Sequence, residues 1–442
     1  MNIRFDRAAY DKLIERYRVD GSKAWIKAEV TIDGKTYPQV GMRLKGNSSL
    51  FGIGGRGPRG LPADVVLPAG LAGGRGPGGS ADAKKPESLP WLIRLDKYID
   101  DQAHQGIAEV VVRSSTTKTA INEIVALELL DRAGLASEKS ASVRFRVNDG
   151  AEVLRLVIES PNQKWMEDRF GPNGMLYKAD SSGDYSYRGT DPTSYGEAWS
   201  QEAGEEDIRP LIEFLRFVNE STDSEFESQL PKRLDVDSFA TYLAIQELFN
   251  NFDDIDGPGN NSYLHYDVST QRFTVVPWDH NLAFVGSPFG GAGPFGAFGV
   301  PADPARDADL GGLLPATDTE TDTDTETETD TVVAGTATDT VVPDGGAVAN
   351  ADAGVDGPGF GGAGFPAFLQ KDNNLVSRFH KVASFEAKYE AAKVELRASL
   401  FGATATSILK TRAAVIRSGA NDLVSEATVA EESATLEAAF KN

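Results

Sequence analysis

One segment of the chain, residues 247–284, restricts the fold more than any other. A helical stretch ends at Asn250-Asn251, and three aspartates and the helix breaker Gly257-Pro258-Gly259 follow it. Apolar strands then lead to a second polar cluster, so a hairpin carries that cluster back towards the first. Such convergent hard oxygen ligands suit a Mg²⁺-nucleotide site. The oxygen-bearing side chains are those of Asp253, Asp254, Asp256, Asn260, Asn261, Asp279 and Asn281.

A calcium loop is an alternative interpretation of the first cluster. Asp254-Ile255-Asp256-Gly257 matches the second half of such a loop. However, Phe252 stands where the loop should open with a ligand, and Tyr263 stands where the closing glutamate belongs. Structural calcium and plain turn chemistry therefore stay open beside a catalytic metal site.

Composition excludes several classes of function. The net charge is −22, and residues 303–356 hold 14 acidic residues against one basic residue, so no basic stripe for nucleic acid is present. The absence of cysteine excludes disulfides and thiolate chemistry. No apolar run approaches the roughly 20 residues of a membrane span. We expect a secreted or surface protein whose export signal lies outside this sequence, with a cytoplasmic location as the alternative.

Periodicity divides the 442 residues into four parts. Residues 1–162 predict an antiparallel sheet with a helix at 119–133, and residues 163–285 predict a mainly helical part that contains the polar clusters. Residues 286–370 are rich in glycine and then in alternating Thr and Asp or Glu, which predicts disorder because no apolar face exists to bury. Residues 371–442 predict helices at about 374–400, 404–417 and 422–440.

Two further patterns suggest phosphate binding. In residues 41–49, Arg43 and Lys45 share one strand face, and Gly46 permits close backbone approach to an anion. A polar hairpin end is the simpler alternative. Glu123 lies on the apolar helix, and the strand before it carries Arg94 and Lys97; a strand cation paired with a helix carboxylate holds nucleotide phosphates in kinases. A solvated helix charge is the simpler alternative there.

The chain resembles the spore coat kinase family, CotH, over most of residues 25–285. The motifs that carry the resemblance appear in the family's order: Arg43-Leu44-Lys45-Gly46-Asn47-Ser48-Ser49, Ile93-Arg94-Leu95-Asp96-Lys97, Asn122-Glu123, Val157-Ile158-Glu159, Gly174-Met175-Leu176-Tyr177-Lys178, Asn251-Phe252-Asp253, Asn260-Asn261-Ser262-Tyr263-Leu264 and Pro277-Trp278-Asp279-His280-Asn281. The glycine-rich and Thr/Asp-rich insertions depart from the family pattern. So does the segment from Ser114 to Thr119, where the family often has an aspartate.

The resemblance implies an α+β, atypical two-lobed protein-kinase-like fold, with an antiparallel-sheet N-lobe and a mainly helical C-lobe. It also implies ATP- and Mg²⁺-dependent phosphorylation of Ser or Thr in surface, secreted or coat proteins, with Mn²⁺ or Ca²⁺ as alternative metals. By analogy, Asp253 accepts the substrate proton and Asp279 holds the metal, while the shorter reach to Asn261 favours Asp256 as the alternative base. The expected nucleotide-binding residues are Arg43, Lys45, Asn47, Ser48, Arg94, Lys97, Glu123 and Glu159, and the expected metal ligands are Asp279, Asn261 and Asn281.

Two other functions remain open at this stage. A kinase-fold adhesin or scaffold would keep metal or nucleotide only for stability. A kinase-like fold can also transfer another group, such as AMP.

Overall fold

The computed structural model describes residues 1–46, 48–50, 53, 81–180, 183–255, 257, 260–285 and 373–441. Two sheets and ten helices in these residues confirm the predicted α+β class. The predicted disordered insertion, residues 286–370, lies outside the described residues, as do Asn47 and Asp256.

The first sheet closes into a barrel in the strand order β1-β2-β3-β4-β5-β7-β6. Its strands are β1 (Asn2–Phe5), β2 (Ile26–Ile32), β3 (Lys35–Leu44), β4 (Trp91–Arg94), β5 (Glu109–Val112), β6 (Ser140–Val147) and β7 (Val153–Glu159). The Asp33-Gly34 turn joins β2 to β3 as its sequence predicts, with both residues at positive φ.

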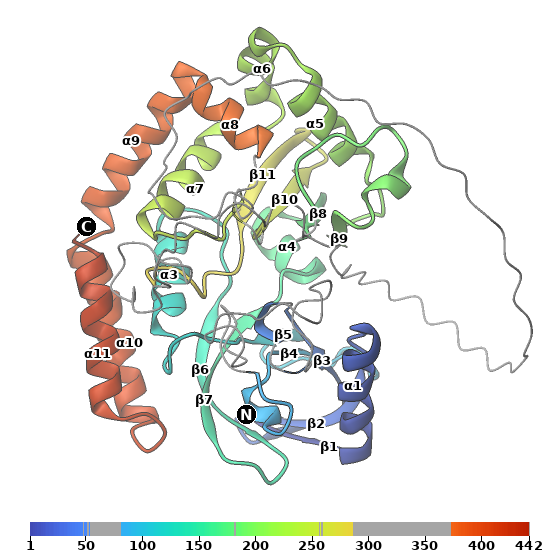
Figure 1. Ribbon diagram of the computed structural model, residues 1–442, viewed down its shortest axis with the longest axis vertical. Coiled ribbons are helices and arrows are strands. Elements are labelled where there is room, and N and C mark those ends of the chain that lie inside the picture. The colour runs from blue at the N-terminus through green and yellow to red at the C-terminus, as the bar shows by residue number, and fades with distance from the viewer. Residues whose placement is uncertain are drawn as a thin grey trace, which may run out of the picture.

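Closure depends on β1, which the sequence did not predict. This short strand pairs antiparallel with β2 and parallel with β6. Ile3 is its one buried residue, so the strand shows too little alternation to be recognised. The N-terminal amine adds a bond to the carbonyl oxygen of Arg144, at 2.7 Å. Helix α1 (Arg7–Asp20) packs beside this sheet (Figure 1).

The second sheet has four strands in the order β11-β10-β8-β9. They are β8 (Gly174–Ala179), β9 (Trp199–Ala203), β10 (Ser262–Asp267) and β11 (Arg272–Pro277). The sequence predicted the β10–β11 hairpin but missed β8 and β9. All six residues of β8 are buried, and a fully buried strand lacks the alternation by which strands are recognised. The helices of this part are α4 (Gln163–Phe170), α5 (Arg209–Glu220), α6 (Asp223–Gln229) and α7 (Val236–Leu248).

Helix α3 (Ile121–Arg132) follows β5 and precedes β6 of the first sheet, and it is buried on nearly every side. Its apolar residues belong to the same core cluster as the second sheet and the C-terminal helices, whereas most of the barrel interior forms a separate cluster. The packing of α3 is therefore tied to the part of the molecule that carries the polar clusters.

Four C-terminal helices follow: α8 (Asn374–Lys381), α9 (Ala383–Ser399), α10 (Ala403–Gly419) and α11 (Glu426–Ala439). The predicted helix 374–400 is broken at Val382, which has an extended backbone. Figure 1 shows these helices along one edge of the molecule, from α7 to the side of α3. In the described part of the chain, no helix is both long and apolar enough to span a membrane.

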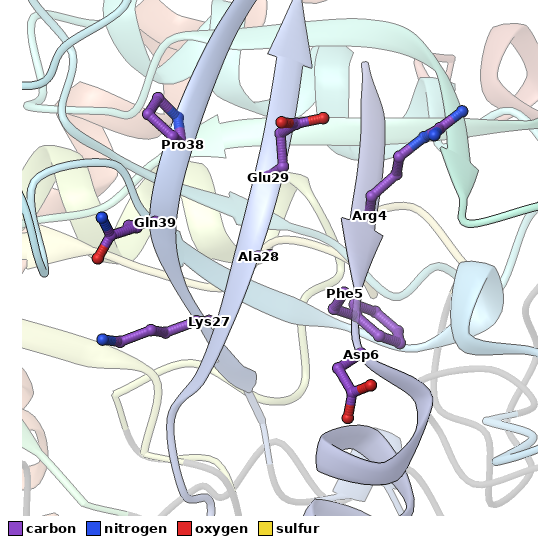
Figure 2. Close-up of a pocket in the computed structure, with 8 residues that line it drawn as sticks. All are labelled: Arg4, Phe5, Asp6, Lys27, Ala28, Glu29, Pro38 and Gln39. Atoms are coloured by element: carbon purple, nitrogen blue, oxygen red, sulfur yellow. The ribbon is translucent and has the colours of Figure 1, made fainter.

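A shallow hollow of about 420 Å³ lies over β1, β2 and β3 (Figure 2). It coincides with a β-bulge between Ala28 and Val30. None of the predicted site residues lines it, and its charged side chains are of both signs. The lining residues are Arg4, Phe5, Asp6, Lys27, Ala28, Glu29, Pro38 and Gln39.

Candidate functional site

The centre of the candidate site is an arginine that the sequence analysis did not single out. Arg113 directly follows β5, and its backbone N–H donates to the carbonyl oxygen of Leu156 at 2.8 Å. Its Nε donates to Oε1 of Glu123 at 2.8 Å, and its Nη2 donates to Oδ1 of Asp279. One guanidinium thus joins the helix α3 carboxylate to the second polar cluster. The available signal was a charged residue at the end of the apolar run Val110–Val112, where a buried cation needs a partner.

The charges in this triad do not balance. Glu123 is 1% exposed, and burial raises its pKa to about 7, with Arg113 opposing that shift and Asp279 adding to it. Burial alone would lower the pKa of Arg113, but the two carboxylates raise it, so this side chain stays charged. When both carboxylates are ionised, the triad carries a net negative charge that favours a further cation.

The segment after β11 holds Asp279 in a strained backbone conformation. Asp279 has φ +57°, in the left-handed region that costs a non-glycine residue roughly 1–2 kcal/mol. The side-chain amide of Asn122 donates to the carbonyl oxygens of Asn281 at 2.8 Å and Ala283 at 3.2 Å. Helix α3 therefore fixes the segment on the C-terminal side of Asp279 directly.

A buried polar chain links the two clusters. The Nδ2 of Asn251 donates to Oε1 of Gln246 at 2.9 Å, and Gln246 Nε2 lies 3.0 Å from Nε2 of His280. Burial lowers the pKa of His280 to about 3, so the ring is neutral and accepts this hydrogen bond. This hydrogen bond ties the residue next to Asp279 to helix α7, and the sequence analysis did not single out His280.

In the first cluster, Asp253 is bonded to Asn261. The Nδ2 of Asn261 donates to Oδ2 of Asp253 at 2.9 Å, and its backbone N–H donates to the carbonyl oxygen of Asp254 at 3.1 Å. The β10–β11 register pairs Ser262 with Pro277. Asn261 and Asp279, which flank that pair, therefore lie at the same end of the hairpin.

The predicted phosphate-binding cations form two pairs, one beside Trp25 and one near Glu109. Arg43 and Lys97 both lie over the ring of Trp25, at 5.1 and 5.2 Å from its centroid. Gly41 permits this, because a Cβ there would lie 2.7 Å from Lys97 Cβ. Arg94 pairs with Asp96 at 3.1 Å.

Lys45 and Arg94 both lie close enough to Glu109 to oppose the rise in its pKa that burial causes. Ser48 lies in the short turn 48–50, and its side chain is outside the described part.

Glu159, which we expected to bind the nucleotide, instead contacts other residues of the protein. Its Oε2 accepts from Arg169 Nη2 at 2.6 Å and from the backbone N–H of Lys139 at 2.9 Å. Arg169 also donates to the carbonyl oxygen of Ser137. This ion pair ties the end of β7 to helix α4.

The residues present fit a metal that is held mainly by a nucleotide. Within the described residues, no group of three His, Asp or Glu side chains is placed to enclose an ion. Asp279 is partly exposed, and its side-chain exposure of 27% contrasts with the 1% of Glu123. Few protein ligands completed by phosphate and water oxygens are typical of Mg²⁺ sites. Asn261, just before β10, and Asp279 and Asn281, in the segment after β11, would provide the protein oxygens.

Fold and site together define an α+β protein in which a buried arginine couples a helix carboxylate to an aspartate at the end of a hairpin. Residues 75–289 match the family model described as "CotH kinase protein". The chain is also 25% identical over 166 residues to "Inner spore coat protein H" of Bacillus subtilis (strain 168), a match that covers 36% of this chain and 45% of that protein. Both matches support CotH family membership of this part of the chain.

The matched regions have limits. The chain spans less than half of the length of the Bacillus relative. The family match contains Arg113, Glu123, Asp253 and Asp279, but it leaves out residues 41–49 and the C-terminal helices.

Proposed function

We propose that this protein is an ATP- and Mg²⁺-dependent protein Ser/Thr kinase with an atypical kinase-like fold. The observation that carries the proposal is the triad of Glu123, Arg113 and Asp279. In kinases, a cation paired with a helix carboxylate holds nucleotide phosphates, and an aspartate after a strand holds the metal. The match of residues 75–289 to the CotH kinase protein family model supports the same assignment.

Arg113 is the cation that we assign to the nucleotide phosphates. It is fixed by Glu123 on one side and is directed at Asp279 on the other. Arg43, Lys45, Arg94 and Lys97 would add positive charge from β3, β4 and the segments that follow them. Asp279, Asn261 and Asn281 would hold the metal, which when bound neutralises charge on the phosphates.

In this proposal, Asp253 is the base. The hydroxyl oxygen of the substrate attacks the γ-phosphorus, the bond to ADP breaks, and the hydroxyl proton passes to the carboxylate of Asp253. The hydrogen bond from the side-chain amide of Asn261 to Oδ2 of Asp253 fixes that carboxylate in place. Asp256 stays the alternative base predicted from the sequence.

The proposed substrates are coat, surface or secreted proteins. The support is the name of the Bacillus relative, an inner spore coat protein. Because the chain carries a net charge of −22, basic or neutral polypeptides are favoured over acidic ones.

The test is phosphate transfer from γ-labelled ATP to a basic protein such as histone or myelin basic protein, with Mg²⁺ or Mn²⁺. We expect transfer by the wild type and a loss of at least about 100-fold in Asp279→Asn, because catalysis here is mostly electrostatic. Asp131→Asn, on the exposed end of α3, is the matched control. Absence of transfer under all these conditions would reject the kinase assignment. The mass of the modified product separates phosphate from AMP.

A non-catalytic scaffold is the second candidate. The observation that favours it is that the proposed metal ligand, Asp279, is bonded to a cation of the protein itself, Arg113. Stabilisation by ATP and Mg²⁺ in a thermal shift assay, without transfer to any protein, would support this candidate.

A further inference from the structure

The N-cap residue of helix α3 provides no side-chain hydrogen bond to the helix. Ala120, at the cap position, has φ +54° and provides no side-chain acceptor. The first amides of a helix need acceptors from elsewhere, and a carboxylate is favoured there by the helix dipole.

A carboxylate from helix α11 binds the segment that leads into α3. Oxygens of Glu432 accept from the backbone N–H of Lys118 at 2.8 Å, from that of Thr119 at 3.2 Å and from the Thr119 hydroxyl. The Thr119 Oγ1 in turn accepts from the backbone N–H of Ile121 at 3.2 Å. The start of α3 is thus completed by a residue more than 300 positions later in the chain.

The first turn of α3, which directly follows the segment bound by Glu432, carries the site contacts. Asn122 holds the carbonyl oxygens of Asn281 and Ala283, and Glu123 holds Arg113, which holds Asp279. Both of these links from α3 to the second polar cluster therefore begin within five residues of the Glu432 contact.

The C-terminal helices attach to both ends of this arrangement. Helix α9 packs on α7, and Lys393 bonds Glu247 there at 2.6 Å. Helix α10 packs on α3, where Arg412 pairs with Glu128. The ring of Phe440, at the end of α11, lies 5.4 Å from the ring of Phe284, measured between their centroids. Phe284 follows Asp279 by five residues. Figure 1 shows α10 and α11 lying alongside α3.

We propose that helices α10 and α11 are an intramolecular positioning element, in which Glu432 holds the first turn of α3 so that Glu123 and Arg113 hold Asp279. In kinases, activity depends on the placement of the helix that bears the paired carboxylate. Here the placement comes from a segment outside the family-matched residues 75–289. The effect on catalysis rests on the proposed kinase function, whereas the effect on the local structure does not.

Hydrogen exchange on the full chain tests the structural part. In Glu432→Ala, we expect the amides of residues 118–124 and 278–284 to exchange about tenfold faster, the equivalent of losing one hydrogen bond to a charged acceptor. Glu431→Ala, on the exposed side of α11, is the matched control and should change neither segment. Faster exchange confined to residues 118 and 119 would overturn the proposal, because Glu432 would then be only a local cap.

Phosphate transfer tests the catalytic part. We expect kcat to fall about tenfold in Glu432→Ala, with the KM for the protein substrate nearly unchanged and the melting temperature within a few degrees of wild type. Glu432→Gln keeps the side-chain length and one acceptor oxygen, so it should give an intermediate kcat and serves if the alanine variant unfolds. An unchanged kcat in an active enzyme would overturn the positioning role. An inactive wild type would reject the kinase function and leave the exchange experiment decisive for the positioning element.

Discussion

Removal of Arg113 tests whether the triad determines both stability and function. In Arg113→Met, the carboxylate of Glu123 stays 1% exposed and loses the bonded cation. Removing one partner of a buried ion pair costs roughly 3–5 kcal/mol, because the other charge remains buried.

The cost should depend on pH. Arg113 opposes the rise in the pKa of Glu123, so its removal lifts that pKa further above the present value of about 7. A folded-state pKa above the ordinary 4.5 contributes stability that is present at low pH and is lost as pH rises through the folded value. Arg113→Met should therefore be less destabilised at pH 6 than at pH 8.

Urea denaturation followed by tryptophan fluorescence at these two pH values measures the effect. Arg113→Met combined with Glu123→Gln removes both charges of the ion pair. The double variant should recover at least about 2 kcal/mol of unfolding free energy at pH 8 relative to Arg113→Met, and neither variant should transfer phosphate. Arg417→Met, which breaks an exposed pair with Glu426, should cost about 0.5 kcal/mol or less. A double variant as unstable as Arg113→Met itself would refute the account of the triad.

Three further predictions concern other groups. Glu138 is buried, neither of its oxygens has a hydrogen-bond partner in another described residue, and burial raises its pKa to about 8. The wild type should therefore lose unfolding free energy between pH 5 and pH 9, and Glu138→Gln should reduce that loss by roughly 2–4 kcal/mol in urea denaturation. An unchanged pH profile of stability would contradict this. Asp253→Asn should lower kcat at least about 100-fold and Asp254→Asn much less, whereas the reverse order in the transfer assay would move the base to Asp254. Gly257→Ala would place a Cβ 2.3 Å from the carbonyl oxygen of Phe252, so the Asp253 loop must shift and transfer should fall at least about tenfold; wild-type activity would show that the loop geometry is not needed.

The parts of the fold with clear local patterns could be predicted from the sequence. Strand β2 alternates and leads into the strong Asp33-Gly34 turn, and Asp235, a residue type favoured at helix N-caps, caps α7 by accepting from the Ser238 amide at 3.1 Å. Strands β1 and β8 could not be predicted, because one is too short and the other is buried on both faces. Closure of the barrel depends on the first of these.

The candidate site shows the same division. The two polar clusters and Glu123 were visible as residue patterns, but their connections were not. Arg113, His280 and Glu432 make contacts with residues far away in the chain, which local periodicity does not encode. The pairing of Glu123 with a cation was predicted in kind, with Arg94 and Lys97 as the candidates, whereas the cation bonded to it is Arg113.

The most direct measurement of the central claim is a crystal structure of the full chain with Mg²⁺ and a non-hydrolysable ATP analogue. The proposed function predicts that the phosphates bind at Arg113, that the metal contacts Asp279, and that the γ-phosphate faces Asp253. Phosphates bound elsewhere, for example over β1–β3 in the hollow of Figure 2, would contradict it.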